Sequence, residues 1–224
     1  MFSRLTIDDL YERSVKVFRP AHNTRPAIFL AKIENKEIII KDFSRNRSLF
    51  AHSIGRLLIW REAKAYRRLQ GIEGIPRFYG TFQGLAIALE YVNAPTLKDE
   101  GKRRKLGSKF FERLKQMIKL VHQRGVAHCD LKKAPNILVS KADEPFLIDW
   151  GASISKEEFR LYPLKLVYER FLLDDWLALT KMKLKFAPEL VSPEERERYE
   201  RRTVVEKAIR KIRDRLRELL QKLV

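Results

Sequence analysis

Apolar and β-branched residues come in short runs through the first 92 residues of the chain. Runs of four to eight such residues, bounded by polar turns, are typical of β-strands. Residues 56–69 instead form a longer stretch that indicates a helix rich in Arg and Lys. The pattern therefore predicts a β-rich amino-terminal part with one helix. The expected strands are residues 14–18, 27–33, 37–41 and 85–92.

A β-hairpin is predicted near the middle of the chain. Two apolar runs, residues 137–139 and 146–148, flank the turn-like residues 141–145, an arrangement typical of two paired strands. Asn136 directly precedes the first strand and Asp149 directly follows the second. Because hairpin strands run antiparallel, we expect these two side chains at the same end of the hairpin.

Helices are expected in the rest of the second half. The last of them begins cleanly, since Ser192 is a good N-cap and Pro193 suits the first helical position. From Val205 to Leu223, apolar residues recur in alternating steps of four and three, which makes a narrow seam flanked by charge. We expect the seam to pack on the chain's own core; a partner helix and a membrane surface are the alternatives. The other expected helices are residues 108–124 and 171–179.

Composition indicates a small globular unit. With 224 residues and 45% hydrophobic residues, the chain can bury a core. Its one cysteine, Cys129, excludes an internal disulfide and is typical of a reducing compartment. No apolar stretch approaches the roughly 20 residues of a transmembrane helix, and the amino terminus lacks a signal-peptide core. We therefore expect a cytoplasmic protein.

The formal net charge of +18 predicts an acidic partner or surface. Basic residues form a run at 102–105 and recur at Lys181, Lys183 and Lys185. Anionic lipid headgroups suit such patches, so peripheral contact with the inner face of the cytoplasmic membrane is one expectation. Nucleic-acid phosphate suits them as well but is less favoured. A solvated surface in a heat-adapted protein is the alternative that requires no partner.

The most informative stretch is His-Cys-Asp-Leu-Lys-Lys-Ala-Pro-Asn at 128–136, followed by Leu-Ile-Asp-Trp-Gly at 147–151. It resembles the catalytic and metal-binding loops of protein-kinase-like phosphotransferases. The resemblance implies that Asp130 accepts the proton of an acceptor hydroxyl, while Asn136 and Asp149 hold Mg²⁺. It also places Lys132 near the transferred phosphate.

Two departures from the pattern concern this stretch. Five residues separate Asp130 from Asn136, where the kinase pattern has four. The loop must therefore bulge by one residue, within limits that Pro135 sets by fixing its own φ. Trp150 replaces the usual Phe after Asp149, which keeps a large apolar side chain. We interpret His128 as a buried residue that shapes the loop and not as a base.

The same resemblance implies a nucleotide site in the first half of the chain. Lys41 ends a β-branched run and would grip the ATP phosphates, with Glu62 on the following helix as its ionic partner. The backbone from Glu90 to Val92 would read the adenine edge. Residues 19–26 contain no glycine, so this loop would have to cover ATP differently from a Gly-rich loop. Asn23, Thr24 and Arg25 are the candidates for that contact.

The implied fold is α+β, with a β-rich N-lobe over residues 1–92 and a helical C-lobe over residues 93–224. No Ala-Pro-Glu signature follows Gly151, so we expect no extended activation segment and no regulation by its phosphorylation. Asp175 matches the kinase carboxylate that anchors the catalytic-loop backbone. The competing interpretation is a carboxylate at a helix start, which the helix dipole favours.

Small atypical kinases are the closest resemblance: bacterial lipopolysaccharide core kinases, which act on Kdo or heptose sugars, and RIO-like protein kinases. They imply ATP and Mg²⁺ as cofactors. Four histidines and one cysteine offer no metal-ligand cluster, so no structural zinc is expected. The leading hypothesis is transfer of the γ-phosphate to a sugar of a membrane glycolipid core. The alternatives are an atypical RIO-like Ser/Thr protein kinase and a nucleotide-binding pseudokinase scaffold, which the missing glycines favour. The acceptor, anionic glycolipid or protein, is not specified by any motif.

Overall fold

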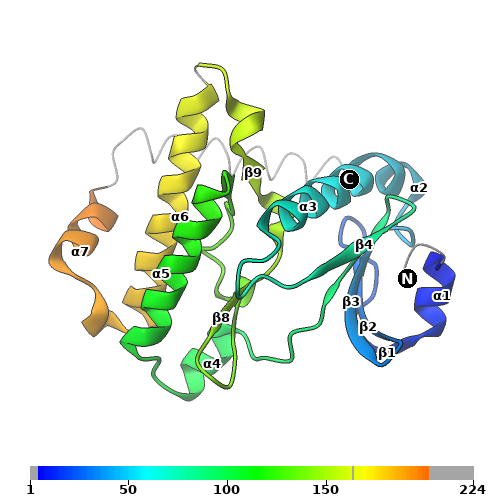
Figure 1. The fold of residues 1–224 in the computed structure, drawn as a ribbon, viewed down its shortest axis with the longest axis horizontal. Coiled ribbons are helices and arrows are strands. Elements are labelled where there is room, and N and C mark those ends of the chain that lie inside the picture. Colours follow the sequence, from blue (N-terminus) through cyan, green and yellow to red (C-terminus); the bar gives the residue numbers. More distant parts are fainter. Residues whose placement is uncertain (1–4, 163, 202–224) are drawn as a thin grey trace.

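The computed structural model describes residues 5–162 and 164–201 of the chain. Figure 1 shows two lobes, one built on a β-sheet and the other mainly helical. This is the predicted α+β arrangement. The sheet has five antiparallel strands in the order β1-β2-β3-β5-β4. Their bounds are β1 (Ser14–Arg19), β2 (Ala27–Ile33), β3 (Lys36–Asp42), β4 (Phe78–Phe82) and β5 (Ala86–Glu90).

Helices cover both faces of this sheet. On one face lies α1 (Ile7–Glu12), with Leu10 fully buried against Phe29 and the sheet. On the other lies α3 (Arg56–Leu69), which follows α2 (Ser48–Phe50) and a π-helical turn (Ala51–Gly55). Because side chains alternate along a strand, Ile38 and Ile40 of β3 face α1, while Ile39 packs with the cluster that contains α3. The same alternation puts Lys41 on the α3 side.

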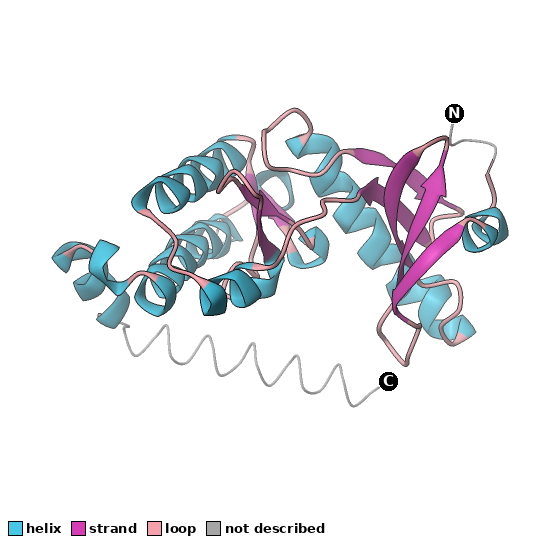
Figure 2. Cartoon of the chain, turned by 90° about the horizontal axis from the view of Figure 1, so that it is seen from below, coloured by secondary structure: helices cyan, strands magenta, loops and turns pink. Residues whose placement is uncertain are grey.

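The helical lobe contains four helices among the described residues and two short β-ribbons. Figure 2 shows the ribbons between these helices and the sheet. One ribbon pairs β6 (Val126–Ala127) with β9 (Ile154–Ser155), and the other pairs β7 (Ile137–Val139) with β8 (Pro145–Leu147). The helices are α4 (Leu97–Arg103), α5 (Ser108–Gln123), α6 (Leu164–Phe186) and α7 (Pro193–Glu200). The ribbon β7–β8 is the predicted hairpin.

One hydrophobic core joins the two lobes. Tyr66 of α3, Phe110 of α5 and Trp150 after β8 belong to the same buried cluster, and each is at most 1% exposed. Trp150 and Tyr66 lie edge to face, with ring centroids 6.5 Å apart. The residues between the lobes are therefore held by packing on both sides.

Two sequence-based expectations need correction. The helix predicted at 171–179 begins seven residues earlier, at Leu164, and ends at Phe186. Lys183 is not part of a basic surface: it is 4% exposed, and its Nζ lies 2.8 Å from Oε1 of Glu195 in α7. The capping box at Ser192 forms as predicted. The seam from Val205 to Leu223 lies outside the described residues.

Candidate active site

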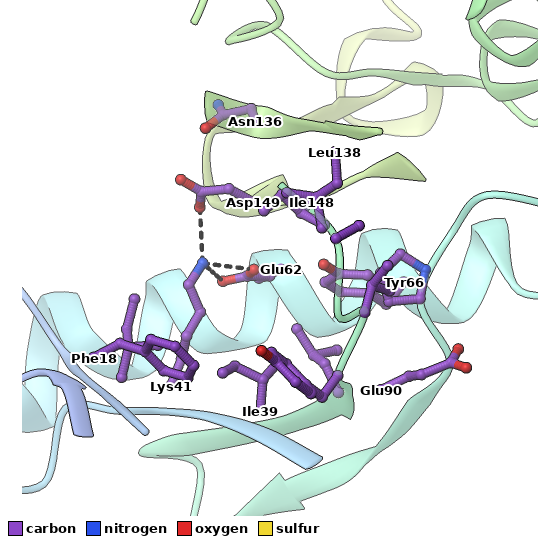
Figure 3. Close-up of a pocket in the computed structure, with 16 residues that line it drawn as sticks. Phe18, Ile39, Lys41, Glu62, Tyr66, Glu90, Asn136, Leu138, Ile148 and Asp149 are labelled. Atoms are coloured by element: carbon purple, nitrogen blue, oxygen red, sulfur yellow. Dashed lines mark hydrogen bonds and ion pairs between the residues drawn. The ribbon is translucent and has the colours of Figure 1, made fainter. Parts of the chain in front are cut away.

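Lys41 of β3 joins two carboxylates that come from different parts of the chain. Its Nζ lies 2.8 and 2.9 Å from the two carboxylate oxygens of Glu62 on α3. The same nitrogen lies 2.7 Å from Oδ1 of Asp149, which follows β8 (Figure 3). The side chains of Lys41 and Glu62 are 14% and 5% exposed, whereas that of Asp149 is 47% exposed. One cation therefore links the sheet, α3 and the loop after β8.

The charges of this cluster depend on one another. The ion pair with Lys41 lowers the pKa of Asp149 to about 2, although burial acts in the opposite direction. Burial opposes the charge of Lys41, but Asp149 and then Glu62 outweigh it and raise the pKa of the ammonium. Burial raises the pKa of Glu62 despite its bond with Lys41. Of the two carboxylates, the more exposed one, Asp149, is thus the one that stays firmly ionised.

Asp149 is fixed in place by the residues beside it. Its backbone is left-handed, with φ of 67°, and Trp150 behind it is fully buried. The Trp150 indole donates a hydrogen bond to the Leu147 carbonyl at 3.3 Å, and its ring lies 4.4 Å from that of His128. His128 is fully buried, and its Nε2 lies 3.1 Å from the Ile148 carbonyl. His128 therefore supports the loops, as predicted.

Asn136 and Asp130 lie together at the start of β7. The Asn136 amide nitrogen donates to the backbone oxygen of Asp130 at 3.1 Å and lies 3.3 Å from its Oδ2. The extra loop residue is accommodated by two successive turns. In the first, the Lys133 N–H donates to the Asp130 carbonyl; in the second, the Asn136 N–H donates to the Lys133 carbonyl. Pro135 lies within this second turn, a 3₁₀ turn.

The second lysine of the loop, Lys133, reaches Asp130. The Nζ of Lys133 lies 2.6 Å from Oδ2 of Asp130. Lys132, which the kinase resemblance favours, is partly buried, and its backbone carbonyl accepts a bond from Lys181 at 3.4 Å. Sequence reasoning missed Lys133. The signal that points to it is the five-residue spacing, which shifts the loop by one position.

Asp175 of α6 anchors the backbone at the start of the loop that contains Asp130. Its carboxylate accepts the backbone N–H of His128 at 2.7 Å and that of Cys129 at 3.0 Å. It also lies 3.0 Å from Nε2 of His122 on α5. Asp175 lies in the middle of α6, so the interpretation as a helix-start carboxylate is wrong. Cys129 has a left-handed backbone with φ of 68°, and the two bonds to Asp175 hold the chain in this turn.

A cavity of about 350 Å³ lies between the lobes above this cluster. It is within the size range of small-molecule sites. Apolar side chains from both lobes line it, including Ile39, Leu89 and Leu138, and the charged group of Lys41 and Asp149 closes one end (Figure 3). An adenine-like ring and a phosphate chain would suit the two ends. The other polar or backbone-exposing residues of its wall include Glu62, Glu90, Val92 and Asn136.

The edge that would face an adenine base is formed by backbone. The N–H of Glu90 is used by the Arg77 carbonyl at 2.8 Å, and its carboxylate accepts the Arg77 N–H at 3.0 Å. The Val92 carbonyl accepts the Ala94 N–H at 2.9 Å. Within the described residues, the Val92 N–H has no partner in the chain. That donor is therefore available at the cavity wall.

The glycine-free loop lies apart from the cavity wall. His22 and Arg25 form an isolated β-bridge that closes the loop, and Asn46 donates to the carbonyls of Asn23 and Arg25. The cavity is lined instead by Phe18 and Ile28, on either side of the loop. Asn23, Thr24 and Arg25 do not line the cavity, so their predicted contact with ATP stays a prediction.

The donors around Asp149 fit a magnesium ion. Asn136 and Asp149 line the same cavity and lie on the same side of it in Figure 3. They offer an amide oxygen and a carboxylate held ionised, which are ligand types that Mg²⁺ prefers. Six of the predicted site residues thus share one cavity: Lys41, Glu62, Glu90, Val92, Asn136 and Asp149. Asp130 adjoins it through Asn136, whereas Lys132 is not among the lining residues.

Comparison with known proteins agrees with this geometry. A probable casein kinase I homolog of Encephalitozoon cuniculi is 31% identical over 111 residues, which cover 46% of this chain and 35% of that protein. Serine/threonine-protein kinase PknD of Chlamydia abortus is 45% identical over 47 residues, 21% of this chain and 5% of that protein. This chain thus spans about a third of the first relative and a small part of the second.

None of the helices in residues 5–162 and 164–201 is long and apolar enough to cross a membrane.

Residues 27–166, more than half of the chain, match the protein kinase domain. That range contains the Lys41, Glu62 and Asp149 cluster, the paired Asp130 and Asn136, and most of the cavity wall. The chain therefore belongs to the protein kinase domain family, whose chemistry is the transfer of phosphate from ATP to a hydroxyl group.

Proposed function

We propose that this chain is an active kinase that transfers the γ-phosphate of ATP to an acceptor hydroxyl. The observation that carries the proposal is the bonding of Lys41 to both Glu62 and Asp149. A protein kinase needs its strand lysine paired with the helix glutamate and its metal-binding aspartate in place at the same time. The contacts of Lys41 with Glu62 and Asp149 support both conditions. A nucleotide-binding scaffold could keep both for ATP binding, so phosphate transfer that depends on Asp130 is what separates the two.

Each residue of the site has a chemical task in this proposal. Lys41 neutralises charge on the phosphate chain, and Glu62 aims Lys41. Asn136 and Asp149 would hold Mg²⁺, which supplies neutralisation of the triphosphate when it is bound. Asp130 accepts the proton of the hydroxyl or orients that hydroxyl for attack. The backbone from Glu90 to Val92 would receive the base, with the Val92 N–H as the donor.

For the acceptor, we propose the hydroxyl of a serine or threonine in a protein. The support is that both relatives carry names of protein kinases, one a casein kinase I homolog and the other a serine/threonine-protein kinase. The sequence alone favoured a sugar of a glycolipid core. Two features still favour that second candidate: the net charge of +18, which suits an anionic glycolipid, and the few residues between Asp149 and α6.

The test is phosphate transfer by the purified full chain with γ-labelled ATP and Mg²⁺. The acceptors are casein, a dephosphorylated lipopolysaccharide core, and no added acceptor. Asp130→Asn is the matched variant, because it keeps the size of the side chain and removes the base. We expect label in protein and a loss of at least 10²-fold in rate for Asp130→Asn.

Each outcome decides between the candidates. Asp130-dependent label in the core oligosaccharide alone would replace the protein acceptor with the sugar. ATP binding without label in any of the three reactions would favour the scaffold. Asp149→Asn provides a second check, since it should weaken binding of the metal-nucleotide complex in calorimetry, whereas Asp130→Asn should leave that affinity nearly unchanged.

A further inference from the structure

The segment that follows Asp149 is short and firmly attached to the helical lobe. Its strand β9 pairs with β6, which directly precedes the catalytic loop. The Lys156 N–H then donates to the Gly125 carbonyl at 2.8 Å. A 3₁₀ turn over Lys156–Phe159 follows and carries Glu157 and Glu158. These two carboxylates therefore have a fixed position relative to the catalytic loop.

Both carboxylates bind cations on α3. Glu158 lies 2.8 Å from Nζ of Lys64 and 3.5 Å from Nη2 of Arg61. Glu157 pairs with Arg68 one turn further along the helix. Arg61 also donates to the Ser153 carbonyl at 2.9 Å. Three basic residues of α3 thus attach to one short segment after Asp149.

The basic residues that bind this segment flank Glu62 along α3. Arg61 directly precedes Glu62 in sequence, and Lys64 and Arg68 follow it on the same helix. A helix shifted or rotated away from the catalytic loop would break these pairs together with the bond between Glu62 and Lys41. The four side chains of Arg61, Lys64, Arg68 and Glu158 are each 25–30% exposed, so solvent screens them only in part. Several pairs that share one geometry stabilise more than isolated surface pairs do.

We propose that Glu157 and Glu158 are positioning residues that hold α3 where Glu62 meets Lys41, so that the site is assembled without phosphorylation. This inference rests on the proposed kinase function. Phosphate on an activation loop orders that loop through new pairs with basic residues, and one phosphate carries about −1.5 to −2 charges. Two glutamates supply a comparable charge permanently.

The serines of the segment agree with a permanent arrangement. Ser153 is 4% and Ser155 is 5% exposed. The Ser153 hydroxyl donates to the Trp150 carbonyl at 2.6 Å, and the Ser155 hydroxyl donates to Glu158 at 3.0 Å. Neither hydroxyl is available to a modifying enzyme while these bonds are formed. The Ser155 bond in turn orients Glu158 toward α3.

The experiment compares the full-length wild type with the double variant Glu157→Gln/Glu158→Gln. Glu112→Gln is the matched control, because Glu112 is an exposed glutamate of α5 whose ion pair with Lys115 is 4.0 Å long. Amide hydrogen exchange of α3 reports how firmly the helix is held, without requiring turnover. Calorimetry gives ATP affinity, and steady-state rates give kcat and KM separately.

We expect exchange in α3 to accelerate about tenfold in the double variant, with kcat/KM for ATP lower by about tenfold. Exchange in α5 should not change. The swap Lys64→Glu/Glu158→Lys should recover part of the loss that either single change causes, because it restores that pair but places a positive charge beside Arg61. Phosphatase treatment of the wild type should leave its rate unchanged.

Unchanged α3 exchange in the double variant, or loss of wild-type activity after phosphatase treatment, would overturn the inference. Failure of the proposed function looks different. In that case the wild type transfers no phosphate to any acceptor, yet the double variant still loosens α3 and weakens ATP binding.

Discussion

The ammonium of Lys133 lies 2.6 Å from Oδ2 of Asp130, the carboxylate proposed to handle the acceptor hydroxyl. The Lys133 side chain is 43% exposed and that of Asp130 is 13% exposed, so the lysine can move toward a phosphate while the aspartate stays in place. The pair lies in the loop that has one additional residue between Asp130 and Asn136. We therefore propose that Lys133 is the cation that contacts the transferred phosphate.

The first prediction concerns the two neighbouring lysines. Lys133→Met should lower kcat about tenfold, because it removes a cation near the developing charge at a half-exposed site. Lys132→Met should have a smaller effect, and ATP affinity should stay similar in both. Steady-state rates on one acceptor would measure the difference. A larger loss in Lys132→Met would return the phosphate contact to Lys132.

The second prediction concerns the coupling between Lys41 and Glu62. Each single change, Lys41→Met or Glu62→Gln, should weaken ATP binding, and the double variant should be little worse than either. Residues in one ionic network typically couple by about 0.5–3 kcal/mol. Calorimetry on the four proteins of this cycle would give the coupling free energy. Additive losses would show that Glu62 does not aim Lys41.

The third prediction concerns Trp150. Trp150→Ala should destabilise the fold by about 3–5 kcal/mol, because a fully buried ring is removed. Trp150→Phe should cost less, since it keeps a ring but loses the bond to the Leu147 carbonyl. Urea unfolding of both variants would measure the free energies. Equal losses would mean that the hydrogen bond and the indole's extra volume contribute most of the stabilisation.

The fourth prediction concerns the reactivity of Cys129. Burial, and then the negative charge of Asp175, raise the pKa of the Cys129 thiol. A raised pKa leaves less thiolate at a given pH, and only the thiolate reacts. Alkylation at pH 8 should therefore be at least about tenfold slower than for a free thiol. The same reaction in urea provides the control, because unfolding should restore the ordinary rate.

The fifth prediction is a pH dependence of stability from Lys183 and Glu195. Burial alone would raise the pKa of Glu195, but the bonds from Lys183 and the Ser192 backbone outweigh it and leave the pKa below its ordinary value of 4.5. The folded state thus binds the proton of Glu195 less readily than the unfolded state. The contribution of the pair is present above pH 4.5 and is lost as the pH falls through the lowered pKa.

Urea unfolding of Glu195→Gln between pH 7 and pH 3 tests this pair. The variant should be less stable than the wild type by about 1–3 kcal/mol at pH 7, because the buried Lys183 loses its counterion. The difference between the two proteins should shrink toward pH 3. A constant difference over this range would show that the charge of Glu195 contributes nothing.

Local patterns explain how much of the fold could be predicted. Strands β1, β2, β3 and β5 follow short apolar runs, α3 follows one long helical stretch, and the hairpin β7–β8 follows its turn. Strand β4 and the short ribbon β6–β9 were not predicted. Helix α1 has only two buried residues, Ile7 and Leu10, too few for a period to be visible. The capping box of Thr6 and Asp9 was the one available signal. The first turns of α6 expose Leu164, Leu166 and Val167, so they show no regular apolar face.

Site residues could be predicted where a known motif lies at the end of a predicted strand. Lys41 and Asp149 each end or follow an apolar run, and Asp175 lies in a recognisable helix. The contacts of Glu158 with Arg61 and Lys64 join residues more than 90 positions apart, and no local pattern records such pairs. The proposed contact with adenine depends on backbone N–H and C=O groups, which every residue except proline offers alike.

The buried Trp150 has a consequence for inhibitor design. Its ring fills the core between His128 and Tyr66, and β9 begins only four residues later. A compound that binds only when Asp149 and Trp150 exchange positions would require the buried indole to leave the core and β9 to separate from β6. Selective compounds for this chain should instead fit the cavity in its present shape, with a hydrogen bond to the Val92 N–H and a contact with Phe18, which lines the cavity.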